Sequence, residues 1–241
     1  MTDIDYYLLF QACKMGNLDE VKRLVDSGAD IHNENGYSLR TAAMNGRFEI
    51  IKYLVCLGAN VGVCSNGPVR WAAARGFLDI VVFLVEHGAD IHEHKNYALR
   101  WASLHGHLAV VKYLVEHGAD IQDCDNGAVK WAAETGNLPV VKYLFENGAD
   151  IRAGNDFAVH WAAEERRFDV VKFLVDHGCS QDDISADAKK YLDFCSKRRV
   201  RAQKKLYFWW IEICYDMTRE CGKRMALRNL DAYNAIVSSY T

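Results

Sequence analysis

The chain has 241 residues, 50% of them hydrophobic, and a formal net charge of −3 at pH 7. This length allows one or two domains, and the apolar fraction is sufficient for a large buried core. The small net charge excludes a strong attraction of the whole chain to nucleic acid or to an anionic membrane, so we expect neither as a partner.

The charge is unevenly distributed between two regions of the chain. Residues 1–180 carry 17 Lys or Arg and 24 Asp or Glu, whereas residues 181–241 carry 12 and 8. The first region therefore has a net charge of −7 and the second a net charge of +4. We predict two parts, an acidic body over 1–180 and a basic tail over 181–241.

The N-terminal sequence "MTDIDYYLLFQACKMGNLDE" lacks the basic segment and the long apolar stretch of a secretory signal. "LYFWWI", the longest apolar run of the tail, is far shorter than the roughly 20 residues that span a bilayer. The eight cysteines form no CxxC pair and do not recur beside histidines at zinc-site spacing. We expect an intracellular, reduced, cytoplasmic environment, with no metal, no other cofactor and no membrane span.

Glycine recurs at a thirty-residue interval through the body. Members of the first set follow an apolar run, where a left-handed glycine typically ends a helix. A second set divides each unit into two helices, but the sixth unit has Arg166 there, which predicts a less favourable turn. The first set is Gly28, Gly58, Gly88, Gly118, Gly148 and Gly178, and the second is Gly16, Gly46, Gly76, Gly106 and Gly136.

The unit from Asn96 to Gly118 shows the pattern of both helices. Small and apolar residues at i, i+3 and i+4 predict a short first helix, and a second apolar series predicts an amphipathic second helix. Neither helix can bury its apolar face alone, so we expect neighbouring units to stack as a solenoid. The positions are Ala98, Leu99, Ala102 and Ser103, followed by Leu108, Val111, Leu114 and Val115.

The repeated unit resembles the ankyrin repeat. "GHLAVVKYLVEHGADI" is similar to the second helix and loop of that family, and "ALRWAS", "PVRWAA" and "AVKWAA" occupy the place of its T-P-L-H-x-A motif. The whole chain resembles the ankyrin proteins that are abundant in giant DNA viruses of amoebae. The resemblance implies an all-α solenoid of six helix pairs over about residues 5–180, with a C-terminal helical cap.

Two departures from the family pattern concern the loops and the motif. The period is thirty residues where ankyrin repeats have about 33. We infer that the β-hairpin finger loops are shortened. The motif's histidine is replaced in most units, which argues against its usual hydrogen-bond network. That position holds Phe10, Arg40, Arg70, Arg100, Lys130 and His160, and only Pro68 keeps the proline.

A second pattern has a period of sixty residues. Units two, four and six carry an aromatic residue where units three and five carry glycine. Duplication of a pair of units is one explanation of this alternation. The aromatic residues are Tyr37, Tyr97 and Phe157, and the glycines are Gly67 and Gly127.

A row of tryptophans with basic neighbours is the candidate partner-binding surface. In ankyrin stacks the first helices line the concave face, where Trp and Arg are the residue types favoured at binding hot spots. The alternative is structural, with the rings packed between units and the basic stems lying over them. The candidates are Arg40, Arg70, Trp71, Arg100, Trp101, Lys130, Trp131 and Trp161.

A basic patch opens the second half of the tail, with six basic residues in nine. It can be a nuclear-targeting or anion-binding patch. Alternatively, it is a solvated helix face beside the acidic body. The residues are Lys197, Arg198, Arg199, Arg201, Lys204 and Lys205.

The aromatic segment "LYFWWIEICYDM" follows the basic patch, and a final stretch, "GKRMALRNLDAYNAIVSSY", has helical apolar spacing. A helix that is apolar all round must be covered, and capping the end of the solenoid is one role. An interfacial membrane helix is another. Some viral ankyrin proteins carry F-box-like tails that recruit ubiquitin ligases, but this tail lacks the Leu-Pro pair of such segments.

No catalytic motif is found in the sequence. There is no Walker loop, GxSxG, HExxH or cluster of zinc ligands. We therefore expect a non-enzymatic, monomeric scaffold that binds an unidentified protein on its first helices. The alternative is an adaptor whose tail recruits a second machine such as a ubiquitin ligase.

Overall fold

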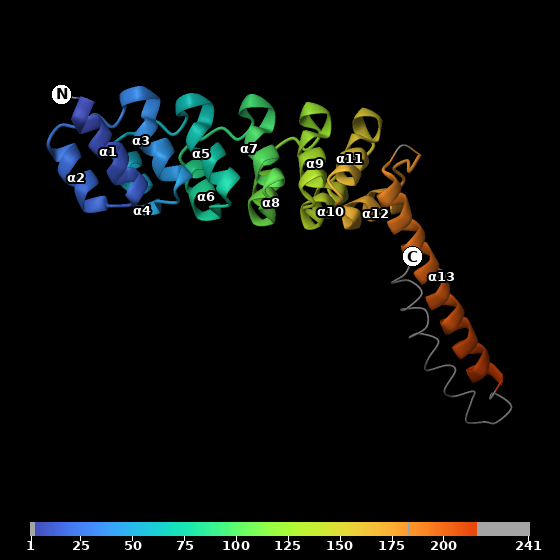
Figure 1. Ribbon diagram of the computed structural model, residues 1–241. Helices are drawn as coiled ribbons and strands as arrows, with labels where there is room; N and C mark the ends of the chain where they lie inside the picture. Colours follow the sequence, from blue (N-terminus) through green and yellow to red (C-terminus); the bar gives the residue numbers. More distant parts are fainter. Residues whose placement is uncertain (1–2, 183, 216–241) are drawn as a thin grey trace. The chain divides into compact units, whose positions relative to one another are not determined.

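The computed structural model describes residues 3–182 and 184–215, and these form thirteen helices with no strand among them. The chain divides into two compact units, Met1–Ser185 and Ala186–Thr241. The first unit holds twelve helices as six consecutive pairs, and α13 belongs to the second unit (Figure 1). The all-helical solenoid predicted from the sequence is confirmed.

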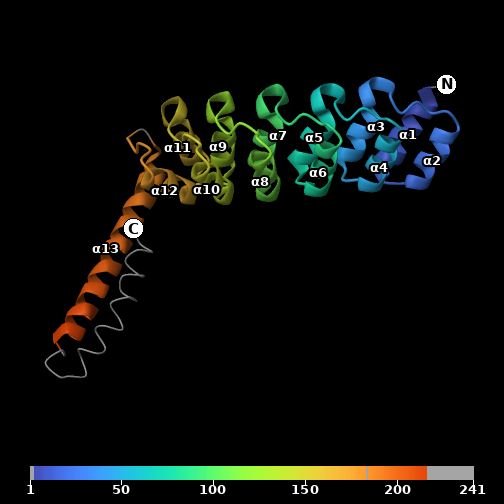
Figure 2. The same ribbon diagram turned by 180° about the vertical axis from the view of Figure 1, so that it is seen from behind.

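The helices of the first unit form two layers. Each odd-numbered helix packs against its odd-numbered neighbours, and each even-numbered helix against its even-numbered neighbours (Figure 2). The odd layer is α1 (Asp3–Met15), α3 (Asn33–Met44), α5 (Val63–Arg75), α7 (Glu93–Leu104), α9 (Asp123–Thr135) and α11 (Ala153–Glu164). The even layer is α2 (Leu18–Asp26), α4 (Phe48–Cys56), α6 (Leu78–Glu86), α8 (Leu108–Glu116), α10 (Leu138–Glu146) and α12 (Phe168–Asp176).

The core lies between the two layers and between neighbouring pairs. In α8, Val110, Val111 and Leu114 are fully buried, and the equivalent residues of α4, α6, α10 and α12 repeat this spacing. Burying such side chains stabilises the fold by about 1.5–3 kcal/mol each relative to exposing them. The first helices bury mostly small residues, so neighbouring helices approach closely. The predicted face of α7 is confirmed as buried at Ala98, Leu99, Ala102 and Ser103.

Both sets of glycines have the predicted left-handed conformation, for example Gly106 at φ +74° and Gly118 at φ +92°. At the first-helix ends close packing adds a second constraint, because a Cβ on Gly136 would lie 2.7 Å from the Cδ of Arg167. The sixth unit keeps the left-handed turn without glycine, with Arg166 at φ +59°. This costs roughly 1–2 kcal/mol for a residue with a side chain.

The loops between units are short, as predicted. The prediction that they form β-hairpins is wrong, because the described residues contain no strand. In their place, three consecutive residues near the start of α5, α7, α9 and α11 form a left-handed helical turn. In α5 these are Cys64, Ser65 and Asn66, at φ +50°, +56° and +55°. The turn closes with a hydrogen bond from Asn66 N to Gly62 O of 3.1 Å. One left-handed turn thus spans the gap with three fewer residues than a hairpin finger.

Candidate functional site

The predicted tryptophan and basic residues form one row along the odd-numbered helices, called here the Trp/Arg row. The helices α5, α7 and α9 each contribute a basic residue and the tryptophan after it, and stacking places equivalent positions in neighbouring helices. All four rings are half-buried. The row comprises Arg40 of α3, Arg70 and Trp71 of α5, Arg100 and Trp101 of α7, Lys130 and Trp131 of α9, and Trp161 of α11.

Trp101 is the centre of the aromatic contacts in the row. Its ring centroid lies 6.1 Å from that of Trp71 and 6.4 Å from that of Trp131, the latter edge to face. Tyr97 of the same helix lies 5.6 Å from the Trp101 ring. Trp161 contacts Phe157 of its own helix, at 5.3 Å. The structure therefore joins the rings of three successive units into one cluster.

The two central arginines hold the left-handed turns from inside their own units. Arg70 Nη2 donates to the carbonyl of Cys64 at 2.9 Å, and Arg100 Nη2 donates to that of His94 at 3.0 Å. Both guanidinium groups also lie near the Tyr97 ring, at 5.3 Å and 4.9 Å from its centroid. The basic residue in the motif's histidine position thus takes over a local hydrogen-bonding role.

The same cation–ring pairing explains the sixty-residue alternation of the sequence. A Cβ on Gly127 would lie 2.9 Å from the Cδ of Arg100, so a small residue is needed beneath that stem. The units that carry an aromatic residue supply the ring instead. Tyr97 of the fourth unit lies near both Arg70 of the third unit and Arg100 of its own unit. Lys130 differs from the arginines because it pairs with the Asp125 carboxylate at 2.5 Å.

A hollow of about 240 Å³ opens at the centre of the row. It is lined by Arg70, Trp71 and Ala74 of α5 and by Tyr97 and Trp101 of α7. Three of its five lining residues are aromatic and one is a cation, so its chemistry suits an apolar group that carries an acceptor or a negative charge.

A buried asparagine ladder, which the sequence analysis missed, connects each left-handed turn to the next unit. Asn96 Oδ1 accepts from the backbone N–H of Asp120 at 3.0 Å, and its Nδ2 donates to Asp123 at 2.7 Å. Asn66 and Asn126 bind the equivalent backbone N–H groups at 2.8 Å. The sequence signal was asparagine at a thirty-residue interval, at the last residue of each turn.

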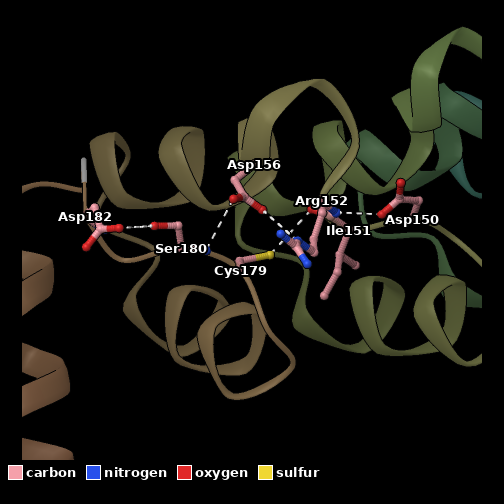
Figure 3. Close-up of polar contacts among 7 residues, drawn as sticks. All are labelled: Asp150, Ile151, Arg152, Asp156, Cys179, Ser180 and Asp182. Atoms are coloured by element: carbon pink, nitrogen blue, oxygen red, sulfur yellow. Dashed lines mark hydrogen bonds and ion pairs between the residues drawn. The ribbon is translucent and has the colours of Figure 1, made fainter.

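The ladder changes at the sixth unit, where Asp156 replaces asparagine (Figure 3). Asp156 Oδ2 accepts from Ser180 N at 3.3 Å, and Oδ1 lies 3.8 Å from Arg152 Nε. The Cys179 thiol donates to the Ile151 carbonyl at 3.5 Å. Burial, followed by the nearby Asp156 carboxylate, raises the pKa of Cys179 to about 12, so this thiol is held protonated and unreactive.

A second set of contacts between units lies at the helix ends. His107 Nε2 bonds to the carbonyl of Ala74 at 3.0 Å, and Asn137 Nδ2 donates to that of Leu104 at 2.9 Å. These carbonyls lie at the ends of the preceding first helices, where intrahelical partners are missing. Arg47 occupies the equivalent position and donates to the carbonyl of Lys14. The polar residue after the turn glycine therefore caps the previous unit.

The basic patch of the tail lies on α13 (Ala186–Tyr215). Lys197 pairs with Asp193 at 2.5 Å, and the Arg198 guanidinium lies 5.7 Å from the Phe194 ring centroid. The described side chains are all exposed, namely Lys197, Arg198, Arg201, Lys204 and Lys205. Arg199 lies in the same helix. The predicted cap formed by 206–217 and the final helix predicted within 222–240 concern side chains or residues outside the described part of the chain.

The comparisons with known proteins agree with the repeat found in the sequence. A family model described as "Ankyrin repeats (3 copies)" matches residues 2–65, 39–125, 69–155 and 122–186. The chain belongs to the ankyrin-repeat family. A search of curated proteins finds no match. Among solved structures, the human ASB11 ankyrin repeat domain is similar, with 24% identity, a TM-score of 0.63, and coverage of 75% of this chain and 87% of that one.

Family membership shows the general class of function. Ankyrin repeats are protein-binding scaffolds and are typically non-catalytic. In the described part of the chain, no group of His, Cys, Asp or Glu has the arrangement of a metal site. No helix described here is long and apolar enough to cross a bilayer. The Trp/Arg row is consequently the surface whose chemistry calls for a functional explanation.

Proposed function

We propose that the chain is a non-catalytic scaffold that binds one partner protein on the concave face of the ankyrin stack, which the odd-numbered helices line. The observation that supports this is the half-buried Trp/Arg row around the hollow at Trp101. A purely structural row would be expected to bury its rings between units. Here the four tryptophans and the three arginines keep part of their surface available, whereas Lys130 is buried, and Trp and Arg are favoured at hot spots.

The test is affinity capture from the native cell with the wild-type chain and with an Arg100→Ala/Trp101→Ala variant. We expect one specific protein to be lost from the variant while its circular dichroism spectrum stays helical. Lys112→Gln on α8 is a matched control, because Lys112 is an exposed cation of the even layer in the same unit. Identical capture by all three chains would refute a binding role for the row.

A second candidate function is an adaptor whose tail recruits another machine, such as a ubiquitin ligase. It is favoured by the separate second unit and by the exposed cations of α13. Deleting 186–241 should leave the captured partner bound and remove a different set of proteins. Aggregation of the truncated chain would instead support a capping role for the tail.

The likeness to ankyrin proteins of giant DNA viruses belongs to the same proposal. It would place the partner in the cytoplasm of a host cell, or in its nucleus if the basic patch of α13 acts in targeting. We propose a monomer as the binding form. A chain that sediments as a dimer would contradict this.

A further inference from the structure

Two side chains that line the hollow, those of Arg70 and Trp101, each carry a hydrogen-bond donor without an acceptor. Arg70 Nε and Trp101 Nε1 are both shielded from solvent, and neither has a partner among the described residues. Both side chains belong to the lining of the 240 Å³ hollow. Leaving such a donor unpaired costs about 1–3 kcal/mol, so two of them together call for an explanation.

The charge of Arg70 is also uncompensated. It contacts the Cys64 carbonyl and the Tyr97 ring, and no carboxylate of the described chain pairs with it. Arg100, one unit along, has the same kind of contacts. In the next unit, by contrast, Lys130 has the Asp125 carboxylate. Two half-buried guanidinium groups therefore lack a counter-ion within a body whose net charge is −7.

The walls of the hollow are more apolar than polar. Trp71, Tyr97 and Trp101 present aromatic surface, and Ala74 leaves space at one side. A volume of about 240 Å³ is below the range of roughly 300–1,000 Å³ that is typical of small-molecule sites. It suits one side chain of a larger ligand. A cationic side chain is disfavoured, because the Arg70 guanidinium already lies near the Tyr97 ring and would repel a second positive charge.

We propose that this hollow binds an acidic peptide segment of the partner, in which an apolar side chain stands next to an Asp or Glu. The apolar side chain packs among Trp71, Tyr97 and Trp101, and the carboxylate pairs with the half-buried Arg70 guanidinium. Arg100 adds a second positive charge for acids farther along the segment. This inference rests on the proposed scaffold function and specifies which surface and which partner chemistry it uses.

The probe is a library of random linear peptides selected on the immobilised wild-type chain, after which enriched peptides are resynthesised and titrated. We expect enrichment of Asp or Glu adjacent to Leu, Phe or Trp. Arg70→Gln should weaken binding about 10-fold or more, as expected for a charge-assisted pair. Trp101→Phe, which keeps a ring but removes part of the aromatic wall, should weaken it about 3- to 10-fold.

A double-mutant cycle links the loss to the proposed contact. Changing the peptide carboxylate to its amide should weaken binding by the wild-type chain but have little further effect on Arg70→Gln. Raising the salt concentration from ~0.05 to ~0.5 M should also weaken binding. Lys112→Gln is the control and should bind like wild type. Each variant is checked for the wild-type helical spectrum, and Arg70→Gln serves alone if Trp101→Phe does not fold.

Several outcomes would overturn the inference. These are failure to enrich any peptide, enrichment of neutral or basic peptides, and binding that is unchanged by Arg70→Gln. In the last case, a partner captured through Arg100 and Trp101 would leave the scaffold proposal standing. Loss of the scaffold proposal requires the separate finding that the Arg100→Ala/Trp101→Ala variant captures the same proteins as wild type.

Discussion

The left-handed turns of the fourth and sixth units have nearly the same backbone but different side chains at their last residue. Asn96, at φ +51°, is buried and bonds both to a backbone N–H and to the Asp123 carboxylate. Asp156, at φ +61°, accepts from the corresponding N–H at 3.3 Å and leaves Oδ1 without a hydrogen bond. The stack thus imposes the turn, and the side chain decides how well the turn is satisfied.

The largest effect is expected from Asn96→Ala. This change leaves the N–H of Asp120 without its acceptor, at about 1–3 kcal/mol, and puts an alanine in a left-handed conformation, at about 1–2 kcal/mol. We expect the free energy of unfolding, measured with urea, to fall by about 3 kcal/mol. Asn96→Gly removes the same hydrogen bonds without the conformational cost and should lose less. Equal losses for the two variants would show that the turn is unstrained.

Asp156→Asn should have the next largest effect, in the opposite direction. A carboxylate normally makes shorter hydrogen bonds than an amide, yet the Asp156 bond is longer than those of the interior asparagines. Its side chain is 13% exposed, and its pair with the exposed Arg152 is long, so we expect the amide to stabilise the fold by about 1 kcal/mol. The reverse change, Asn126→Asp, should destabilise it. If Asp156→Asn were instead less stable than wild type, the ion pair with Arg152 would contribute more than the better hydrogen bond of the amide.

Arg166→Gly tests the other irregular turn of the sixth unit. The interior units have glycine here, for example Gly136 at φ +84°, whereas Arg166 adopts φ +59°. Relief of the left-handed cost is partly offset by the greater freedom of glycine in the unfolded chain and by loss of the interactions of the Arg166 side chain, so we expect a gain of only about 0.5 kcal/mol in urea denaturation. The opposite change at an interior turn, Gly136→Arg, should lower the free energy of unfolding by more than Arg166→Gly raises it, because the new side chain would meet Arg167. A loss for Arg166→Gly would assign the side chain a stabilising role.

The same comparison shows what the sequence could predict. Glycine spacing and apolar periodicity located both helices of every unit, because such patterns depend on the local chain and on the repeat. The left-handed turns were not predictable in this way, since Cys64 and Ser65 are not residues that favour φ > 0. Cys64 is instead bound at its carbonyl by Arg70 of its own unit and at its sulfur by Arg40 of the preceding unit. The hairpin prediction failed because it carried over the family's loop to a shorter period.

The candidate site was predictable only in part, for a related reason. The thirty-residue repeat places Trp71 and Trp101 at equivalent positions of α5 and α7, and their ring centroids lie 6.1 Å apart. That these residues bind a partner stays a prediction. Whether each ring is exposed depends on the spacing and rotation of whole units. Likewise, the buried donors of Arg70 and Trp101 are a property of three-dimensional packing, which no periodicity reports.

The smallest effect is expected at the helix ends, where His107 and Asn137 cap the preceding units in two neighbouring turns. Burial lowers the pKa of His107, although its bond to the Ala74 carbonyl acts in the opposite direction and nearby His105 adds a small lowering effect. The folded chain therefore binds fewer protons than the unfolded chain at mildly acidic pH. Stability from this site is complete above the ordinary histidine pKa of about 6.5 and declines as pH falls toward the lowered value.

His107→Asn removes this titration and keeps a donor, because Asn137 shows that an amide at this position reaches the carbonyl of the preceding unit. At neutral pH the variant should be nearly as stable as wild type. On acidification the wild-type chain should lose more stability than the variant, and urea titrations at pH 7 and pH 5 measure the difference. Parallel losses in the two chains would show that His107 is protonated in the fold as readily as in the unfolded chain, and that its cap does not depend on the neutral ring.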